Sequence, residues 1–362
     1  MIKYLGSKRV LLPAIVGVIE SLPRVRRVGD LFSGTARVGH ALKGAGFAVH
    51  SNDELSYAEH LARCYVQADH ERWGERAQKL LVELRGAPPR SGWFTDDYCE
   101  KARYFRPANG ARIEGVREAI AHLDLEPELE SIALVSLMEA ADRVDSTTGV
   151  QMAYLKQWSA RAENELELRM PAILPRPEAG PCTVSGCDAL QLAPTLDVDV
   201  AYLDPPYNQH SYLGNYHVWE TLVRWDRPEV YGIARKRIDC RERKSLFNRR
   251  REAAAALAAV IDRLETPYVV TSFSDEGHVT RDELVRMLGR NRRVHVLSRG
   301  YARYVGAKIG IHDPQGRKVG QPGRLRNTEY LFVATPDDCA WRPTGVEGFE
   351  PEPAAPELEP EG

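Results

Sequence analysis

The sequence predicts an α/β protein built on a doubly wound, Rossmann-like sheet with a helical domain inserted into it. Three observations favour this fold. Short apolar runs typical of buried strands alternate with stretches of helical periodicity. Acidic side chains follow several of these runs, at the strand ends where an open α/β sheet places its ligands. A charged, helix-rich stretch separates the second run from the third, after which the apolar runs resume.

The expected strands are short, and the expected helices lie between them. Strands are expected at 27–32, 48–53, 182–190, 198–203, 268–273, 293–297 and 330–334. Helices outside the insertion are expected at 11–22, from the turn 33–39 through 42, around 216–222, at 252–264 and at 281–288. The last two strands are expected to pair with each other.

The overall composition indicates a globular protein. Its 362 residues with 43% hydrophobic content suffice for one large domain or two. The first residues, 1–6, lack the apolar core of a signal peptide, and no run of about 18 apolar residues is present, so we expect a cytoplasmic protein without a membrane span. The cysteines form no C-x-x-C pair and have no histidine at ligand spacing, so neither a disulfide framework nor a metal site is indicated. They are Cys64, Cys99, Cys182, Cys187, Cys240 and Cys339.

The turn after the first strand has the features of a ligand site. Gly34 allows the backbone to approach a ligand closely, and Asp30 at the end of the strand can bind an amino group. One glycine turn is weak evidence by itself. It gains weight because the second strand ends in Asp53 about twenty residues later, where a carboxylate can accept both hydroxyls of a ribose.

The stretch 57–180 predicts an inserted helical domain. Helices are expected at 57–85, 110–123 and 127–145, and 171–181 is the linker back to the sheet. Aromatic side chains lie among polar groups in its loops, and most of them are expected to pack in the core.

A tight, stiff turn, Asp204-Pro205-Pro206-Tyr207, leaves the carboxyl end of the strand 198–203. The Asp204 carboxylate and the Pro205 carbonyl are two acceptors, and Tyr207 offers an aromatic face. This set suits an exocyclic amine on a flat ring, because the acceptors can take its two N–H protons while the ring stacks on Tyr207. An ordinary loop is the alternative for the motif taken alone.

Charge is distributed unevenly along the chain. The net charge is −2, but the segment 343–362 holds six Glu and no Lys, Arg or Asp, so residues 1–342 carry +4. Basic residues concentrate at 235–251 and 299–326, where solvated faces and nucleic-acid contacts are alternative explanations. From 341 to 362 the chain is rich in Pro and Glu without periodicity, and we expect this tail to be disordered.

The ordered motifs resemble one known family, the D12 class of adenine-N6 DNA methyltransferases. The motifs, in chain order, are Tyr4-x-Gly6-x-Lys8, Asp30-x-Phe32-x-Gly34, Asn52-Asp53 and Asp204-Pro205-Pro206-Tyr207, with the insertion before the last. The resemblance covers roughly 1–54 and 181–335. It implies a doubly wound methyltransferase sheet with an antiparallel last strand, and an inserted region that reads DNA sequence.

The resemblance also implies a domain plan: a catalytic domain of 1–56 plus 181–340, with 57–180 as the recognition domain. It implies S-adenosylmethionine as cofactor, no metal, double-stranded DNA as substrate and a cognate restriction endonuclease as a candidate partner. The target adenine would be flipped out of the duplex. Catalysis would fall to Asp204, Pro205, Pro206 and Tyr207, and the residues expected to bind the cofactor are Tyr4, Lys8, Asp30, Phe32, Gly34, Asp53 and Asp188.

Two groups of residues are expected to contact DNA. Arg249, Arg250 and Arg251, together with Arg324 and Arg326, flank the catalytic sheet and are expected to hold phosphates. In the insertion, Arg106 and Lys156 are expected to read base pairs.

Three alternatives stay open at this point: cytosine-N4 methylation, which needs the same amine geometry, adenine methylation of RNA, and a catalytically idle DNA-binding protein. The sequence also departs from the family at Ala36, where the glycine loop often carries a second glycine. A methyl group there is small, so the expected cofactor site is little affected.

Overall fold

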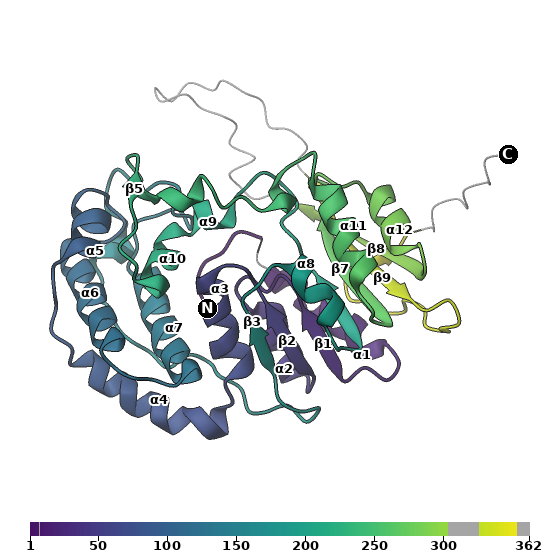
Figure 1. The fold of residues 1–362 in the computed structure, drawn as a ribbon, viewed down its shortest axis with the longest axis horizontal. Coiled ribbons are helices and arrows are strands. Elements are labelled where there is room, and N and C mark those ends of the chain that lie inside the picture. Colours follow the sequence, from purple (N-terminus) through teal and green to yellow (C-terminus); the bar gives the residue numbers. More distant parts are fainter. Residues whose placement is uncertain (7, 303–325, 353–362) are drawn as a thin grey trace.

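The structure is a computed structural model that describes residues 1–6, 8–302 and 326–352. The described residues form a central mixed sheet of eight strands in the spatial order β10-β8-β9-β7-β4-β1-β2-β3 (Figure 1). The strands are β1 (Arg27–Asp30), β2 (Ala48–Asn52), β3 (Thr183–Ser185), β4 (Val200–Leu203), β7 (Tyr268–Ser274), β8 (Arg293–Ala302), β9 (Arg326–Thr335) and β10 (Glu350–Pro351).

The strand directions confirm the predicted doubly wound sheet. β3, β2, β1, β4 and β7 run parallel to their neighbours. β9 lies antiparallel between β7 and β8, as the predicted antiparallel last strand and the predicted pair require. From β1 the chain moves first to β2 on one side, and later to β4 on the other. The strand order therefore reverses between β1 and β4, where such folds open a crevice for ligands.

Helices cover both faces of the sheet. Successive side chains of a strand point to opposite faces, so each face presents apolar side chains that a helix can bury. Val200 and Tyr202 of β4 belong to one apolar cluster, and Ala201 and Leu203 to another. The first cluster includes residues of α1 (Leu12–Ser21), α2 (Arg37–Gly44) and α3 (Ser56–Ala62). The second includes residues of α8 (Ala189–Leu192), α11 (Ala253–Arg263) and α12 (Arg281–Leu288).

The segment between β2 and β3 is helical, as expected, and gathers beside the sheet (Figure 1). After α3 it consists of η2 (Arg63–Gln67), α4 (His70–Arg85), α5 (Trp93–Thr95), η3 (Asp96–Glu100), α6 (Pro107–Ala121), α7 (Pro127–Arg143) and η4 (Ala160–Glu163). Its apolar residues join those of the sheet in one continuous cluster, and Phe94, Tyr98, Tyr104 and Phe105 are buried, as expected for most aromatics here. A separate recognition domain at 57–180 stays a prediction.

After β4, short elements lie across the carboxyl end of the sheet. They are α9 (Tyr212–Asn215), α10 (His217–Arg224), the hairpin β5 (Val230–Tyr231) and β6 (Lys236–Arg237), η6 (Ile238–Cys240) and η7 (Leu246–Asn248). Two other short helices, η1 (Lys8–Val10) and η5 (Ala193–Thr195), precede β4 in the chain. Within the described ranges, no helix combines the length and apolar character needed to cross a membrane.

The prediction of a disordered tail from 341 onward is wrong for residues 341–352. Trp341 and Phe349 are buried, and β10 pairs antiparallel with β8. Trp341 Nε1 donates to Ser21 Oγ at 2.9 Å, and its ring packs against His295 with centroids 5.2 Å apart. Two large apolar side chains are thus enough to hold a segment that lacks periodicity. The rest of the predicted tail, 353–362, lies outside the described residues.

Candidate active site

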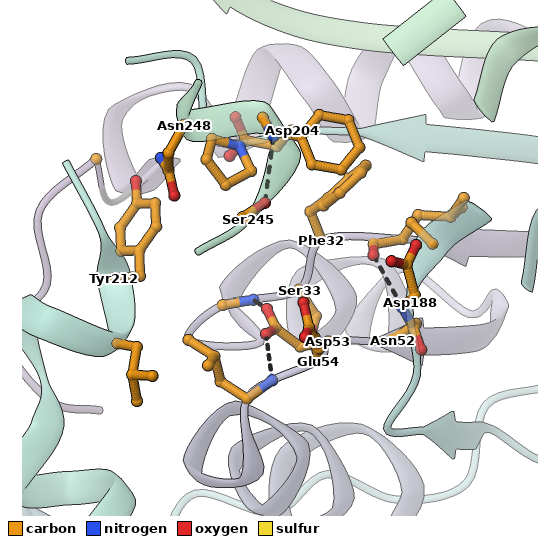
Figure 2. A pocket seen from close by; sticks show the side chains of 18 of the residues that line it. Phe32, Ser33, Asn52, Asp53, Glu54, Asp188, Asp204, Tyr212, Ser245 and Asn248 are labelled. Carbon is orange, nitrogen blue, oxygen red and sulfur yellow. Dashed lines mark hydrogen bonds between the residues drawn. The ribbon is translucent and has the colours of Figure 1, made fainter. Parts of the chain in front are cut away.

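A cavity of about 300 Å³ opens at the carboxyl ends of β1 and β4, where the strand order reverses (Figure 2). Most residues predicted to act on cofactor or substrate line it. Those residues are Tyr4, Lys8, Asp30, Phe32, Gly34, Asp53, Asp188, Asp204 and Pro206. Residues that lie far apart in the sequence thus meet because parallel strands end at the same edge of the sheet.

Asp30 ends β1 and is almost fully buried at the base of the cavity. Neither of its carboxylate oxygens accepts a hydrogen bond of normal geometry from the described residues. Burial, and then the nearby carboxylates of Asp204 and Asp53, raise the pKa of Asp30 to about 8. The nearby backbone N–H of Gly39 opposes this shift, but it does not reach either oxygen with normal hydrogen-bond geometry, so this buried carboxyl group can still bind a cationic group.

The turn after β1 brings the backbone toward the cavity. Gly34 has φ +50°, and a Cβ placed there would lie 3.4 Å from the ring of Tyr4. Ala36 also has a left-handed conformation, with φ 59° and ψ 19°. The family's second glycine would adopt this conformation freely, whereas alanine adopts it at some cost in conformational energy.

Asp53 follows β2, and its carboxylate accepts hydrogen bonds from two backbone amides (Figure 2). Its oxygens accept from Gly34 N at 2.9 Å and from Leu55 N at 3.0 Å. Burial raises the pKa of Asp53 to about 6, although these two hydrogen bonds oppose the shift. Asp188, next along the rim, caps α8 by accepting from Leu190 N at 2.7 Å. Each carboxylate oxygen has a second lone pair with which to bind a ligand.

Asp204, at the end of β4, forms an ion pair with Lys8. Lys8 Nζ lies 3.0 Å from Asp204 Oδ1, and the side chains are 8% and 19% exposed. Burial raises the pKa of Asp204, and the Lys8 ammonium opposes that shift. Burial alone would lower the pKa of Lys8, but Asp204 and then Glu329 outweigh it, so the lysine stays charged. The pair therefore favours an ionised acceptor at the cavity wall.

Among the described residues, the Tyr207 carbonyl of this turn is hydrogen-bonded, whereas those of Pro205 and Pro206 are not. His278 N donates to the Tyr207 carbonyl at 2.7 Å. By contrast, no donor among the described residues hydrogen-bonds the Pro205 carbonyl, as the proposed role of this oxygen requires. The Tyr207 ring contacts Phe273 edge-on at 5.8 Å between centroids, and Lys8 Nζ lies 5.8 Å from its centre.

Tyr4 lies between two other tyrosines, an arrangement that the sequence motifs do not indicate. Its ring stacks on Tyr212 with centroids 5.1 Å apart and on Tyr216 at 4.5 Å. The Tyr216 hydroxyl accepts from Leu5 N at 2.6 Å, so the stack also fixes the loop that carries Lys8. Tyr4 and Tyr212 both line the cavity, whose wall is therefore partly aromatic.

Residues 242–248 form another wall of the cavity. They belong to the basic stretch 235–251, for which a solvated face and nucleic-acid contacts were the alternative expectations. Phe247 packs edge-on against Phe32 at 5.1 Å, and Asn248 lies beside Tyr212 (Figure 2). Arg243, in the same wall, is 3.4 Å from the fully buried Glu220. Nothing local in the sequence signals this wall, because its contacts are all with distant segments.

A family comparison supports the chemistry suggested by this geometry. The family model described as D12 class N6 adenine-specific DNA methyltransferase matches residues 4–287, which includes the helical segment as well as the motif-bearing strands. The chain belongs to this D12 class. The resemblance inferred from the motifs is thereby confirmed.

Several curated proteins are similar to this D12 chain. It is 30% identical over 354 residues to the type II methyltransferase M.FokI of Planomicrobium okeanokoites, covering 92% of this chain and 53% of the relative. It is 29% identical over 307 residues to the modification methylase LlaI of Lactococcus lactis subsp. lactis, covering 80% and 48%. Against the type II methyltransferase M.NlaIII of Neisseria lactamica it is 29% identical over 283 residues, covering 76% and 83%. The chain spans about half the length of the first two relatives.

Three of the residues of this D12 chain predicted to hold phosphates, Arg249, Arg250 and Arg251, lie outside the cavity lining. Arg249, Arg250 and Arg251 are exposed, and Arg249 forms an ion pair with Glu252 at 2.9 Å. Arg324 lies outside the described residues. Arg326 begins β9, and only its backbone is described.

Other members of the basic stretch 235–251 serve the fold. Arg237 is buried, with 2.7 Å contacts to Asp226 and a second ion pair with Asp239, and Arg235 pairs with Asp97. Their contribution to a phosphate-binding surface is therefore smaller than the sequence suggests.

The two insertion residues predicted to read DNA also lie away from the cavity. Arg106 is half-buried, forms an ion pair with Glu163 and lies over the Trp158 ring at 4.7 Å. Lys156 is exposed, and its backbone carbonyl accepts from Arg103. The contact between Arg106 and the Trp158 ring holds this loop in place, and Lys156 is exposed to solvent on it.

Proposed function

We propose that the protein transfers a methyl group from S-adenosyl-L-methionine to N6 of an adenine flipped out of double-stranded DNA. The observation that carries this proposal is the ion-paired Asp204 carboxylate, which lines the same cavity as Asp30 and Asp53 and directly precedes Pro205, a residue outside the lining. Membership in the D12 class supports adenine N6 over cytosine N4 as the methylated atom.

The residues present suit S-adenosylmethionine, which when bound supplies an electrophilic methyl group on a sulfonium centre. Asp30, a buried carboxyl group at the base of the cavity, suits the cofactor's ammonium group. Asp53 suits the ribose hydroxyls, and Gly34 lets the backbone come close to the methionine part. Asp188 is proposed to face the cofactor's adenine at the rim. Tyr4, Lys8 and Phe32 complete the walls.

Asp204 and Pro205 are proposed to hold the target amine. Adenine N6 is a poor nucleophile because its lone pair is delocalised into the ring. Two acceptors that bind both N–H protons direct the lone pair toward the incoming methyl group, so that positioning and electrostatics supply most of the catalysis. As the N6–CH₃ bond forms, the S–CH₃ bond would break with its electron pair left on sulfur, and the amine would then lose one proton, which the ionised Asp204 carboxylate is proposed to accept. Tyr207 is proposed to stack on the base, with Pro206 stiffening the turn.

DNA is the proposed substrate, and a cognate restriction endonuclease is a proposed partner. Flipping the adenine costs a few kcal/mol, which stacking on Tyr207 and phosphate contacts offset. Arg249, Arg250 and Arg251 are proposed to supply phosphate contacts, because they are exposed on the segment that follows the cavity wall. Arg106 and Lys156 belong to the proposed reading surface of the insertion.

The test replaces Asp204. Asp204→Ala is expected to abolish methyl transfer while cofactor affinity by calorimetry survives, because the carboxylate holds the amine and not the cofactor. Asp204→Asn, which keeps the shape beside Lys8, is the second variant and should also be strongly impaired. Asp197→Ala, which removes an 83% exposed carboxylate just before the same strand, is the control.

The product is identified by mass spectrometry of nucleosides after reaction with DNA or RNA. N6-methyladenine in DNA is expected. N4-methylcytosine, methylation confined to RNA, or substantial turnover by both Asp204 variants would contradict the proposal.

A further inference from the structure

The side-chain amide of Asn248 bridges two backbone carbonyls of the loop that follows Tyr207. Asn248 Nδ2 donates to the Asn208 carbonyl at 2.7 Å and to the His210 carbonyl at 3.1 Å. Asn248 ends η7 and lies 40 residues further along the chain than Asn208. It is therefore a long-range clamp on the loop between β4 and α9.

The chemistry of the amide fixes the orientation of the clamp. A carbonyl oxygen can only accept, so the NH₂ group must face Asn208 and His210, and both of its protons are used. Aspartate has the same shape but no donor at neutral pH, and alanine has neither shape nor donor. Of these three side chains, only asparagine has both the shape and the N–H donors that the Asn208 and His210 carbonyls require.

The clamped segment, residues 208–210, directly follows the proposed base-holding groups. It begins directly after Tyr207, whose own carbonyl is held by His278 N at 2.7 Å, and it is tightened by His210 N donating to Asn208 Oδ1 at 3.0 Å. No α-helix or β-strand lies between Leu203 and Tyr212, so these hydrogen bonds set its position.

The residue next to Asn248 in the chain contacts the part of the cavity that is proposed to bind the cofactor. Phe247, adjacent to Asn248, is buried and packs edge-on against Phe32, which follows β1. Asn248 also lines the cavity near Tyr212 (Figure 2). The Asn248 amide therefore connects the segment 208–210, which follows the proposed base-holding groups, to the cavity wall formed by residues 242–248.

We propose that Asn248 is a positioning residue for methyl transfer, acting through the loop 207–210 on Tyr207 and the Pro205 carbonyl. This inference rests on the proposed function. Misplacement of reacting groups by about 1 Å can cost about 100-fold in rate, even when the altered residue does not touch the reacting atoms. Loss of the clamp therefore acts on the rate of the chemical step and leaves cofactor binding intact.

The experiment measures single-turnover methylation of a duplex with the full-length protein and saturating S-adenosylmethionine. Asn248→Ala is expected to lower the rate about 10- to 100-fold, with cofactor affinity by calorimetry within about twofold of wild type. Asn248→Asp is expected to lose at least as much, because its carboxylate faces two carbonyls without a donor. Asn248→Ser keeps one donor on a shorter side chain and should fall between wild type and Asn248→Ala. Asn291→Ala, at an exposed asparagine between α12 and β8, is the matched control.

A second substrate separates positioning from base flipping. In this duplex the target adenine lies opposite an abasic site, which lowers the cost of flipping. The Asn248 variants are expected to remain slow on it, since alignment and not extrusion is impaired. Recovery of the wild-type rate on this substrate, or wild-type rates on the ordinary duplex, would overturn the proposal. An inactive wild-type protein would instead refute the proposed function, so the two failures are distinguishable.

Discussion

At the scale of single residues, the carboxyl group of Asp30 links protein stability and cofactor binding to pH. Its pKa is raised from the ordinary value of 3.8 to about 8 by burial and by the charges of Asp204 and Asp53. The folded protein therefore keeps a proton on Asp30 up to about pH 8, whereas the unfolded chain releases it near pH 4. Since the folded state binds more protons in this window, its free energy of unfolding falls as pH rises from about 4 to 8.

Asp30→Asn removes this titration. Without cofactor, the variant's melting temperature should fall less than that of wild type between pH 5 and 8, because no buried carboxyl group ionises at this position. Calorimetry should show weaker binding of S-adenosylmethionine, and a smaller gain in affinity from pH 6 to 8, because the ammonium partner is lost. Asp197→Asn serves as the exposed control. Parallel pH profiles for the Asp30 variant and wild type would show that Asp30 is not the titrating group.

At the scale of elements, the segment 341–352 acts as an added edge to the sheet. β10 pairs with β8 through Glu350 and Pro351, and Glu352 N donates to the Val296 carbonyl at 2.8 Å. Trp341 bridges α1 and β8 through its contacts with Ser21 and His295. The segment therefore stabilises the sheet edge farthest from the helical insertion.

Trp341→Ala tests this contribution. Truncating a buried tryptophan removes its apolar contacts and leaves a cavity, so we expect a loss of about 3 kcal/mol in the free energy of unfolding. Urea denaturation followed by far-ultraviolet circular dichroism measures it, with Thr344→Ala at an exposed position as control. A midpoint unchanged from wild type would mean that the segment contributes nothing to stability.

Most strands and helices were predictable because their signals are local. Two expectations were wrong: the strand expected at 182–190 ends at Ser185 and its last two residues begin α8, and the helix expected at 57–85 is interrupted between Gln67 and His70. Apolar runs such as 198–203 and the helical period of 281–288 each identify their element without knowledge of the rest of the chain. β10 escaped prediction because it is two residues long and lies among Pro and Glu residues. Its order comes from Trp341 and Phe349, whose partners are distant in the sequence.

The site was predictable where residues end parallel strands. Asp30, Asp53 and Asp204 lie at the ends of β1, β2 and β4, and topology alone brings them to one edge. Asp188, expected at a strand end, instead caps α8 three residues after β3. The Lys8–Asp204 pair, the Tyr4 stack and the Asn248 clamp each join segments that are separated by loops of irregular backbone. No periodicity specifies such contacts, so sequence reasoning found some of their members but none of their pairings.

At the scale of the whole molecule, the proposed DNA contacts fall on two parts of the chain. The exposed arginines 249–251 follow the cavity wall directly, whereas Lys156 and Gln157 are exposed on the loop braced at Trp158 in the insertion. Contacts to phosphates position a protein on DNA, and contacts to base edges specify sequence. The location of each group relative to the cavity therefore suggests a division between holding and reading.

Replacing Arg249, Arg250 and Arg251 by Ala should weaken binding to every duplex to a similar degree. Because fewer counterions are released on binding when a phosphate contact is lost, the slope of log affinity against log salt should flatten by up to about 0.9 per contact. The methylated motif should not change.

Lys156→Ala and Gln157→Ala should instead relax preference at particular base pairs, at roughly 1–3 kcal/mol each. Salt titrations and long-read sequencing of methylated DNA measure the two effects, with Lys79→Ala on α4 as control. An altered motif from the arginine variant, and none from the insertion loop, would place the reading surface on the catalytic side while leaving methylation itself intact.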